Sequence, residues 1–251
     1  MKEEALKEFL YKMADDQLII GHRNSEWTGL GPLLEEDIAF SSMAQDKLGQ
    51  SYTLYSMLSD LGESDPDNIA FMRNSEQFHN CQFVELPIGE YDFSLIRHFL
   101  FDTAELLRFE LLGNSSFTPL AQAAKKFSGE IRYHTMHANS FMKQLGGDNE
   151  ESNLRLQKSL DYAMPYALGI FENAEHEEIL INEHLWVGEE ELQSLWIEKV
   201  SDIIEKASLT MPDISSLQPV LGGRKGQHTE YLQPLLEEMT EVVKLDPTAE
   251  W

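Results

Sequence analysis

The residues of this chain that could do chemistry lie on predicted helices, close to the spacing that di-iron proteins use. Such proteins place a carboxylate on one helix and Glu-x-x-His on the next, twice over, because residues three apart point the same way. In the second half of this pattern, Asp102 lies among apolar neighbours and His134 follows on the next helix. Three residues before His134 stands Ile131, which cannot bind a metal, and Glu130 is one position off, about 100° around the helix. This half of the site is therefore incomplete.

The first half of the pattern is emptier. Lys47-x-x-Gln50 stands where Glu-x-x-His would be required. Lysine is a cation that repels iron, and a glutamine amide is a poor ligand for it. An unconventional ligand set remains an alternative, and its members would be Asp46, Asp102, Glu130 and His134.

The elements that must position these residues are helices. Apolar residues recur at three- and four-residue spacing, whereas strand signals are nearly absent. Gly146-Gly147 is expected to end the fourth long helix, and Pro165 to kink the fifth. The predicted long helices cover about 3–27, 33–61, 91–112, 118–145, 152–171, 189–208 and 229–245, with a short one near 67–73.

Four long helices joined in pairs are typical of a four-helix bundle, so the predicted fold class is all-α. We expect a single domain over residues 1–251, because no Pro- or Ser-rich linker divides the chain. The core bundle would cover about 3–146, and additional C-terminal helices about 152–245. A purely structural bundle would explain every apolar position without any chemistry.

The composition excludes several classes of partner. There are 44 acidic residues against 19 basic ones, which gives a formal net charge of -25. Such a charge repels phosphate backbones and anionic lipid surfaces, so we expect no nucleic acid and no membrane among the partners. The single cysteine, Cys81, cannot form an intramolecular disulfide, and the N-terminus shows no apolar signal core. The expected location is the cytoplasm.

The order of several short stretches makes the chain resemble a known family. Each stretch is weak alone, but together they run the whole length of the chain to Trp251. The stretches that carry the resemblance are 24–27, 34–39, 46–50, 83–87, 99–102, 130–134 and 222–230. Through them the chain is similar to the C subunits of the ring-1,2-phenylacetyl-CoA epoxidases, also called phenylacetate-CoA oxygenases, which are ferritin-like proteins.

The resemblance implies what became of the metal ligands. In this family the catalytic A subunit resembles the C subunit and binds two irons. Its Asp-Glu-Ala-Gly-His motif aligns with 46–50, and its second Glu-x-x-His aligns with 131–134. The implied ligand positions are Glu26, Asp102 and His134, which survive, and Lys47, Gln50 and Ile131, which are replaced. We therefore expect no metal and no catalytic residue in this chain.

Lys47 and Glu26 are the two positions where the sequence suggests more than the resemblance does. We hypothesise that Lys47 balances the buried carboxylates that a metal would otherwise balance, since unpaired buried charge is costly. Glu26 lies close to the end of its helix, whereas Lys47 lies well inside the next one. Asp15 or Asp16, which lie further inside the first helix, could therefore take the place of Glu26 beside Lys47 along the bundle axis.

The resemblance also implies partners and cofactors. The chain would be a non-catalytic scaffold that pairs with the A subunit in a hetero-oligomer and supports epoxidation of the ring of phenylacetyl-CoA. The di-iron centre would belong to that partner, and a separate reductase with flavin and an iron–sulfur cluster would supply electrons. Two alternatives remain: an independent di-iron or ferritin-like metal-binding oxidoreductase, and a metal-free helical homo-oligomer with an unrelated binding role.

Other conspicuous residues have simpler explanations. His134 would be a buried histidine hydrogen-bonded to Asp102, and its His-x-x-His pair with His137 lacks further ligands for zinc. The acidic stretch 172–184 is predicted to be solvated surface. Arg224-Lys225 either forms an exposed turn or contacts the partner or the coenzyme's phosphates. The aromatic residues predicted to lie in the core or an interface are Tyr162, Tyr166, Phe171, Trp186 and Trp196.

Overall fold

The computed structural model describes residues 1–246, and every regular element in that range is a helix. This confirms the predicted all-α fold class. Trp251, where the resemblance ends, lies outside the described residues. Four long helices form the centre of the molecule, namely α1 (Lys2–Ser25), α2 (Leu34–Asp60), α4 (Tyr91–Leu112) and α5 (Thr118–Asp148).

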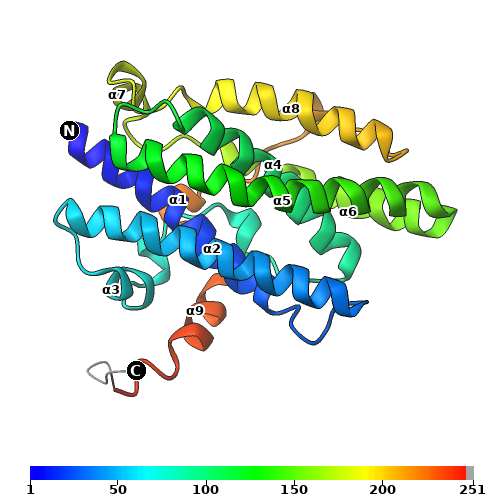
Figure 1. Cartoon of the computed structure of the whole chain (residues 1–251), viewed down its shortest axis with the longest axis horizontal. Coiled ribbons are helices and arrows are strands. Elements are labelled where there is room, and N and C mark those ends of the chain that lie inside the picture. The colour runs from blue at the N-terminus through cyan, green and yellow to red at the C-terminus, as the bar shows by residue number, and fades with distance from the viewer. Residues whose placement is uncertain (247–251) are drawn as a thin grey trace.

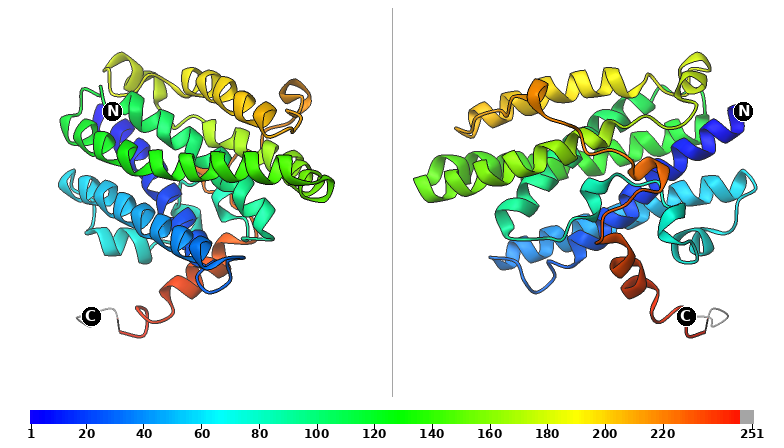
Figure 2. Two further views of the ribbon diagram at one scale, coloured as in Figure 1. Left: turned by 45° about the vertical axis from the view of Figure 1, so that its right-hand side comes forward. Right: turned by 180° about the vertical axis from the view of Figure 1, so that it is seen from behind.

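The four long helices pack as two pairs. Helix α1 lies along α2, and α4 lies along α5. In the view of Figure 1, α2 and α5 form the front layer with α1 and α4 behind them, and the turned views of Figure 2 keep the same helices side by side. The faces in contact are apolar, with Leu10, Phe99 and Leu100 fully buried. Each such side chain contributes roughly 1.5–3 kcal/mol through its removal from water.

Shorter elements surround this bundle. Helices α6 and α8 pack against α4, while α9 extends toward the C-terminal end in Figure 2. Trp196 of α8 is fully buried, and its indole N–H donates to the carbonyl of Leu100 at 2.9 Å. These helices are α3 (Pro66–Phe71), α6 (Glu150–Leu168), α7 (Glu177–Asn182), α8 (Glu189–Lys206) and α9 (Leu232–Thr240). The 3-10 turns are η1 (Ser75–Gln77), η2 (Gln82–Glu85), η3 (Gly169–Phe171), η4 (Ile214–Ser216) and η5 (Gly223–Lys225).

Helix α5 does not end at Gly146-Gly147, and that prediction was wrong. The helix continues to Asp148. A Cβ atom at Gly146 would lie 2.1 Å from the carbonyl oxygen of Ala207, the residue that follows α8. Glycine at this position therefore lets two segments approach closely, and one glycine inside a helix costs only about 1 kcal/mol.

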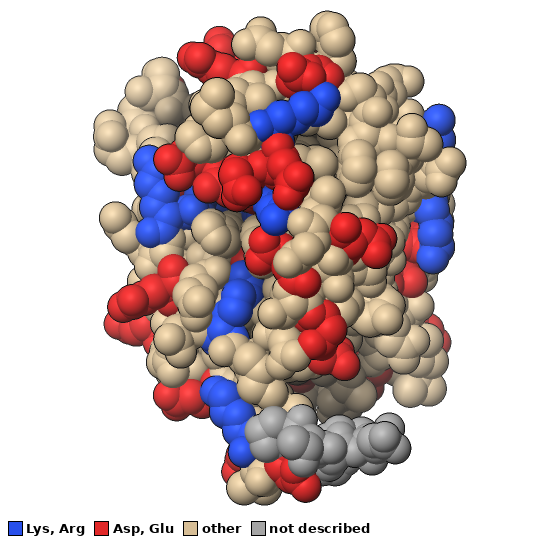
Figure 3. Space-filling view, turned by 90° about the vertical axis from the view of Figure 1, so that its left-hand side faces the viewer, with Lys and Arg blue, Asp and Glu red and all other residues tan. Residues whose placement is uncertain are grey.

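The acidic stretch 172–184 is more ordered than the sequence indicated. It contains α7, whose Leu180 is buried. Most of its acidic side chains are exposed or half-buried, but Glu172 is only 9% exposed and accepts the backbone N–H of Gly222 at 2.7 Å. Figure 3 shows the end of the molecule near α7, where acidic side chains are spread over the surface. The prediction that this stretch is solvated surface is thus correct for most of its acidic residues and wrong for Glu172.

A network of buried charges joins α1, α4 and α8. The Glu189 carboxylate lies 2.8 Å from the amine of Lys12 and is also bound by the guanidinium of Arg108. Arg108 in turn donates to Glu105 at 3.0 Å. All four side chains are almost completely buried. The free-energy cost of burying each charge is therefore offset only by the opposite charges of its partners.

This network should make the stability of the protein fall in acid. Burial alone would raise the pKa of Glu189, but Arg108 and Lys12 lower it from 4.5 to about 2. A depressed carboxyl pKa stabilises the folded state fully above the unfolded value and loses that contribution as the pH falls toward 2. Urea unfolding between pH 7 and pH 3 should therefore show a loss of about 2 kcal/mol from this group. The Glu189→Gln variant should show a shallower pH dependence, and equal slopes for the two proteins would contradict the assignment.

Candidate functional site

Three of the predicted site residues meet in the interior between α2, α4 and α5. The amine of Lys47 lies 2.5 Å from Oδ1 of Asp102, and Nδ1 of His134 lies 3.7 Å from Oδ2 of the same carboxylate. The three side chains are between 0% and 2% exposed. Lys47 thus pairs with a buried carboxylate, as the hypothesis drawn from its sequence position requires.

Neighbouring helices shape the space around Lys47. Gly21 of α1 faces it, because a Cβ atom there would lie 3.2 Å from Cβ of Lys47. The amine also lies 5.1 Å from the ring centroid of Phe101. Burial alone would raise the pKa of Asp102, but Lys47 and the nearby imidazoles hold it well below its usual range. The carboxylate is therefore charged at neutral pH.

The closest imidazole to Asp102 is one that the sequence reasoning missed. Nδ1 of His98 lies 2.5 Å from Oδ2 of Asp102, one helical turn away on α4. His134, the expected partner, instead places Nε2 at 3.0 Å from Oδ2 of Asp46. The i, i+4 spacing of His98 and Asp102 was the available signal, but it identifies the pair only once the burial of this part of α4 is known.

A second group of polar residues continues from this cluster. Nε2 of His137 lies 3.0 Å from Oε1 of Glu36, and the hydroxyl of Tyr91 donates to Oε2 of Glu36 at 2.5 Å. Burial opposes the charge of Glu36, but the hydrogen bonds from His137 and Tyr91 lower its pKa. His134 and His137 therefore face different carboxylates and do not form the His-x-x-His pair of a metal site.

The contact between His98 and His137 depends on protonation. Both rings present a proton to a carboxylate, because an ionised carboxylate only accepts hydrogen bonds. The remaining nitrogens, Nε2 of His98 and Nδ1 of His137, are 3.4 Å apart and can hydrogen bond only when one ring carries a second proton. Burial lowers the pKa of His98, so a second proton on the His98 ring is weakly held.

Several predicted ligand positions do not join the cluster. Gln50 donates to Glu130 at 3.0 Å, and Ile131 is part of the apolar core. Glu26 pairs with Arg23 at 2.6 Å beside the end of α1, so the structure does not place Glu26 next to Lys47 along the bundle axis.

The alternatives to Glu26 do not fill its place either. Asp15 binds Arg73 at 2.5 Å, and Asp16 binds Arg224 at 2.8 Å. The part of α1 that faces Lys47 is therefore Gly21, which has no ligand atom in its side chain.

These residues do not fit a di-iron centre. Both oxygens of Asp102 are engaged, by Lys47 and by His98. A lysine ammonium beside that carboxylate supplies positive charge and would repel a metal cation. Of the unconventional ligand set, Glu130 binds Gln50 instead of facing Asp102. Within residues 1–246, no group of three or more histidine, cysteine, aspartate and glutamate side chains has an arrangement that could hold a metal ion.

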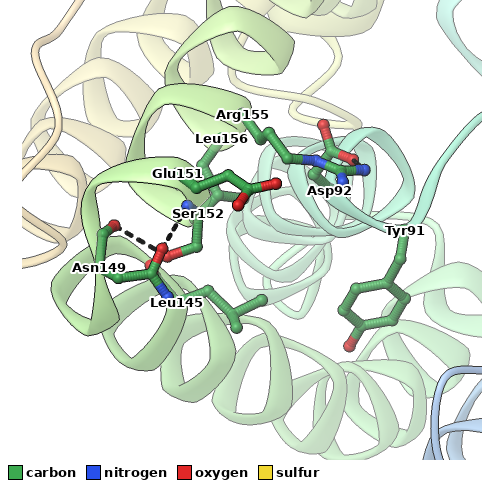
Figure 4. Close-up of a pocket in the computed structure, with 8 residues that line it drawn as sticks. All are labelled: Tyr91, Asp92, Leu145, Asn149, Glu151, Ser152, Arg155 and Leu156. Atoms are coloured by element: carbon green, nitrogen blue, oxygen red, sulfur yellow. Dashed lines mark hydrogen bonds and ion pairs between the residues drawn. The ribbon is translucent and has the colours of Figure 1, made fainter.

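A surface pocket of about 290 Å³ lies between the start of α4 and the turn from α5 to α6 (Figure 4). Two of its charged side chains are paired, since Arg155 donates to Asp92 at 3.0 Å, and the third, Glu151, is exposed. Figure 4 shows the hydroxyl of Tyr91 turned away from this polar group, and that hydroxyl binds Glu36. The hydroxyl of Tyr91 is therefore engaged outside this group of charged residues.

Arg224 and Lys225 have separate environments. Arg224 is buried against Asp16, whereas Lys225 is exposed. Neither sequence-based explanation holds for Arg224, which is not part of an exposed turn and is not available to a partner or to phosphates. No helix within the described range is long and apolar enough to cross a membrane.

The paired long helices with a polar centre between them define the class of the protein, a ferritin-like helical bundle. The chain belongs to the phenylacetic acid catabolic protein family, whose match covers residues 1–251. It is 30% identical over 247 residues to the C subunit of the 1,2-phenylacetyl-CoA epoxidase of Escherichia coli (strain K12), a match that covers 98% of this chain and 99% of that protein. The family resemblance found in the sequence is thereby confirmed.

Proposed function

We propose that this chain is the non-catalytic structural subunit of a multicomponent di-iron oxygenase that epoxidises the ring of phenylacetyl-CoA in phenylacetate degradation. The observation that carries the proposal is the buried pair of Lys47 and Asp102, which puts a cation where a metal would have to bind. The match to the C subunit of an epoxidase over nearly the whole chain supports the reaction. Lys47, Gln50 and Ile131 stand at three positions where the catalytic subunit would carry ligands.

The role of the chain in this proposal is to hold a related catalytic bundle in its working geometry. That partner carries the di-iron centre and binds the coenzyme A ester, because a chain with a net charge of -25 repels the phosphates of the coenzyme. A reductase with flavin and an iron–sulfur cluster supplies the electrons. The complex works in the cytoplasm.

The test is reconstitution from purified parts. The chain is expressed alone, and also together with the catalytic ferritin-like subunit from the same genome. We expect iron only in the complex and oxygen-dependent turnover of phenylacetyl-CoA only when the catalytic subunit and the reductase are present. Stoichiometric iron in this chain alone, with turnover by it alone, would show that it is an independent di-iron oxidoreductase.

A further inference from the structure

The outer face of α2 and α5 carries no fully exposed acidic side chain over most of its length, although the chain as a whole is strongly acidic; Asp46 and Glu130 are only partly exposed there. Between residues 38 and 59 of α2, all the fully exposed side chains are uncharged. Between residues 118 and 147 of α5, the fully exposed charged side chains are basic, and they are Lys125, Lys126, Arg132 and Lys143. Lys126 pairs with Glu130 at 3.7 Å and Arg132 with Glu110 at 3.0 Å, whereas no ion pair within 4 Å is found for Lys125 or Lys143 among the described residues. The two helices lie side by side in the front layer of Figure 1. We call these exposed residues the α2/α5 face.

Large apolar side chains stand out from the α2/α5 face and from the start of α2 beside it. Ile38 and Tyr52 of α2 are each 61% exposed, and Met136 of α5 is 58% exposed. Leu34, one turn before Ile38, is 69% exposed. Scattered apolar residues are ordinary on a protein surface, but exposed apolar side chains on a stretch of α2 without any fully exposed charge mark a contact region on so acidic a chain.

Two glycines in the middle of this face have no explanation within the chain itself. Gly49 of α2 and Gly129 of α5 are exposed, and a Cβ atom at either would meet nothing within 4 Å. Each costs its helix about 1 kcal/mol relative to alanine. They flank the contact between Gln50 and Glu130, so they lie close together across the two helices. Glycine at such a place lets the backbone of another element approach closely.

We propose that the α2/α5 face is the docking surface for the catalytic ferritin-like subunit, an inference that rests on the proposed function. The surface of the partner that meets it is helical, apolar opposite α2 and acidic opposite Lys125 and Lys143 of α5. Such charge complementarity guides association and fixes the register of the two chains. A second copy of this chain is a poorer occupant, because a twofold contact would bring the same basic residues to both sides of the interface.

The test is a direct binding measurement with the purified catalytic subunit from the same genome. The double variant Gly49→Gln/Gly129→Gln adds bulk at two exposed helix positions where glutamine favours the helix, so its melting temperature should not fall. Its affinity for the catalytic subunit should fall at least 10-fold. Ser194→Gln, an equally exposed substitution on α8, is the matched control and should bind like the natural chain.

A charge reversal provides an independent readout. Lys125→Glu/Lys126→Glu should weaken binding most at low salt, where the attraction between exposed charges is least screened. Binding of the double glycine variant with unchanged affinity would overturn the docking surface while leaving the proposed function in place. Failure of the natural chain to bind the catalytic subunit at all would overturn both. Self-association of this chain that the glycine variant abolishes would assign the face to a second copy instead.

Discussion

Replacing Asp102 by asparagine is expected to lower the free energy of unfolding by about 3–5 kcal/mol, because it leaves Lys47 charged and buried without its counter-ion. The amine lies 2.5 Å from the carboxylate in a site whose side chains are at most 2% exposed, so water cannot replace the lost partner. Urea unfolding followed by circular dichroism measures the change. Asp60→Asn, at the exposed end of α2, is the control and should change stability by less than about 0.5 kcal/mol.

The complementary variant separates the ion pair from the other contacts of Asp102. Lys47→Met should also destabilise the fold, but less than Asp102→Asn, because His98 still contacts the remaining carboxylate. In the double variant Lys47→Met/Asp102→Asn no charge of this pair is left unpaired, so the loss should be smaller than the sum of the two single losses. An unfolding midpoint for Lys47→Met equal to that of the natural chain would show that Lys47 does not balance the site.

The helices could be predicted from the sequence because the patterns that indicate them involve residues close together in the chain. Apolar residues at helical spacing, with glycine and proline at the breaks, gave the boundaries of α4 at Tyr91–Leu112 and those of α2 to within one residue at each end. The end of α5 was misjudged because the role of Gly146 depends on Ala207, which is distant in sequence. A local rule cannot anticipate a contact between two segments of the fold.

The site was predictable only in part, for the same reason. Asp102 was found because it is an acid among apolar neighbours, and Lys47 because it stands where a Glu-x-x-His motif would be required; the rule that a buried charge needs a partner then joined the two. His98 was missed because a histidine one turn before an acid is unremarkable until the burial of α4 is known. Glu26 was assigned to the site although α1 ends at Ser25, and the side chain turns back to Arg23.

The buried polar groups show how this fold keeps charges inside a helical bundle. One group centres on Asp102, between Lys47 and His98, and a second centres on Glu189, between Lys12 and Arg108. Each carboxylate has a basic side chain on another helix, so the pairs link helices that apolar contacts alone would leave free to slide. Removing one partner of such a pair leaves the other charge buried and unpaired, so the pairs disfavour arrangements of the helices in which the charges are not matched.

The C-terminal loop is attached to the bundle by a third such pair, formed by Arg224 and Asp16. The guanidinium donates to Asp16 at 2.8 Å and to the carbonyls of His79 and Ile170 at 2.9 and 3.1 Å. Burial would lower the pKa of Arg224, but Asp16 raises it above the ordinary value. The loop can enter the interior because a Cβ atom at Gly223 would lie 2.3 Å from the carbonyl oxygen of Asn80, a contact that glycine alone avoids.

Arg224→Met should therefore lower the free energy of unfolding by about 3–5 kcal/mol, since it leaves the buried Asp16 without its counter-ion. The neighbouring Lys225→Met removes the same charge from an exposed position and should have an effect below about 0.5 kcal/mol. Urea unfolding of the two variants measures this contrast, and limited proteolysis should cut the loop of Arg224→Met first. Equal stability of the two variants would show that the loop is held by its backbone contacts, such as the hydrogen bond from Gly222 to Glu172, and not by the charge of Arg224.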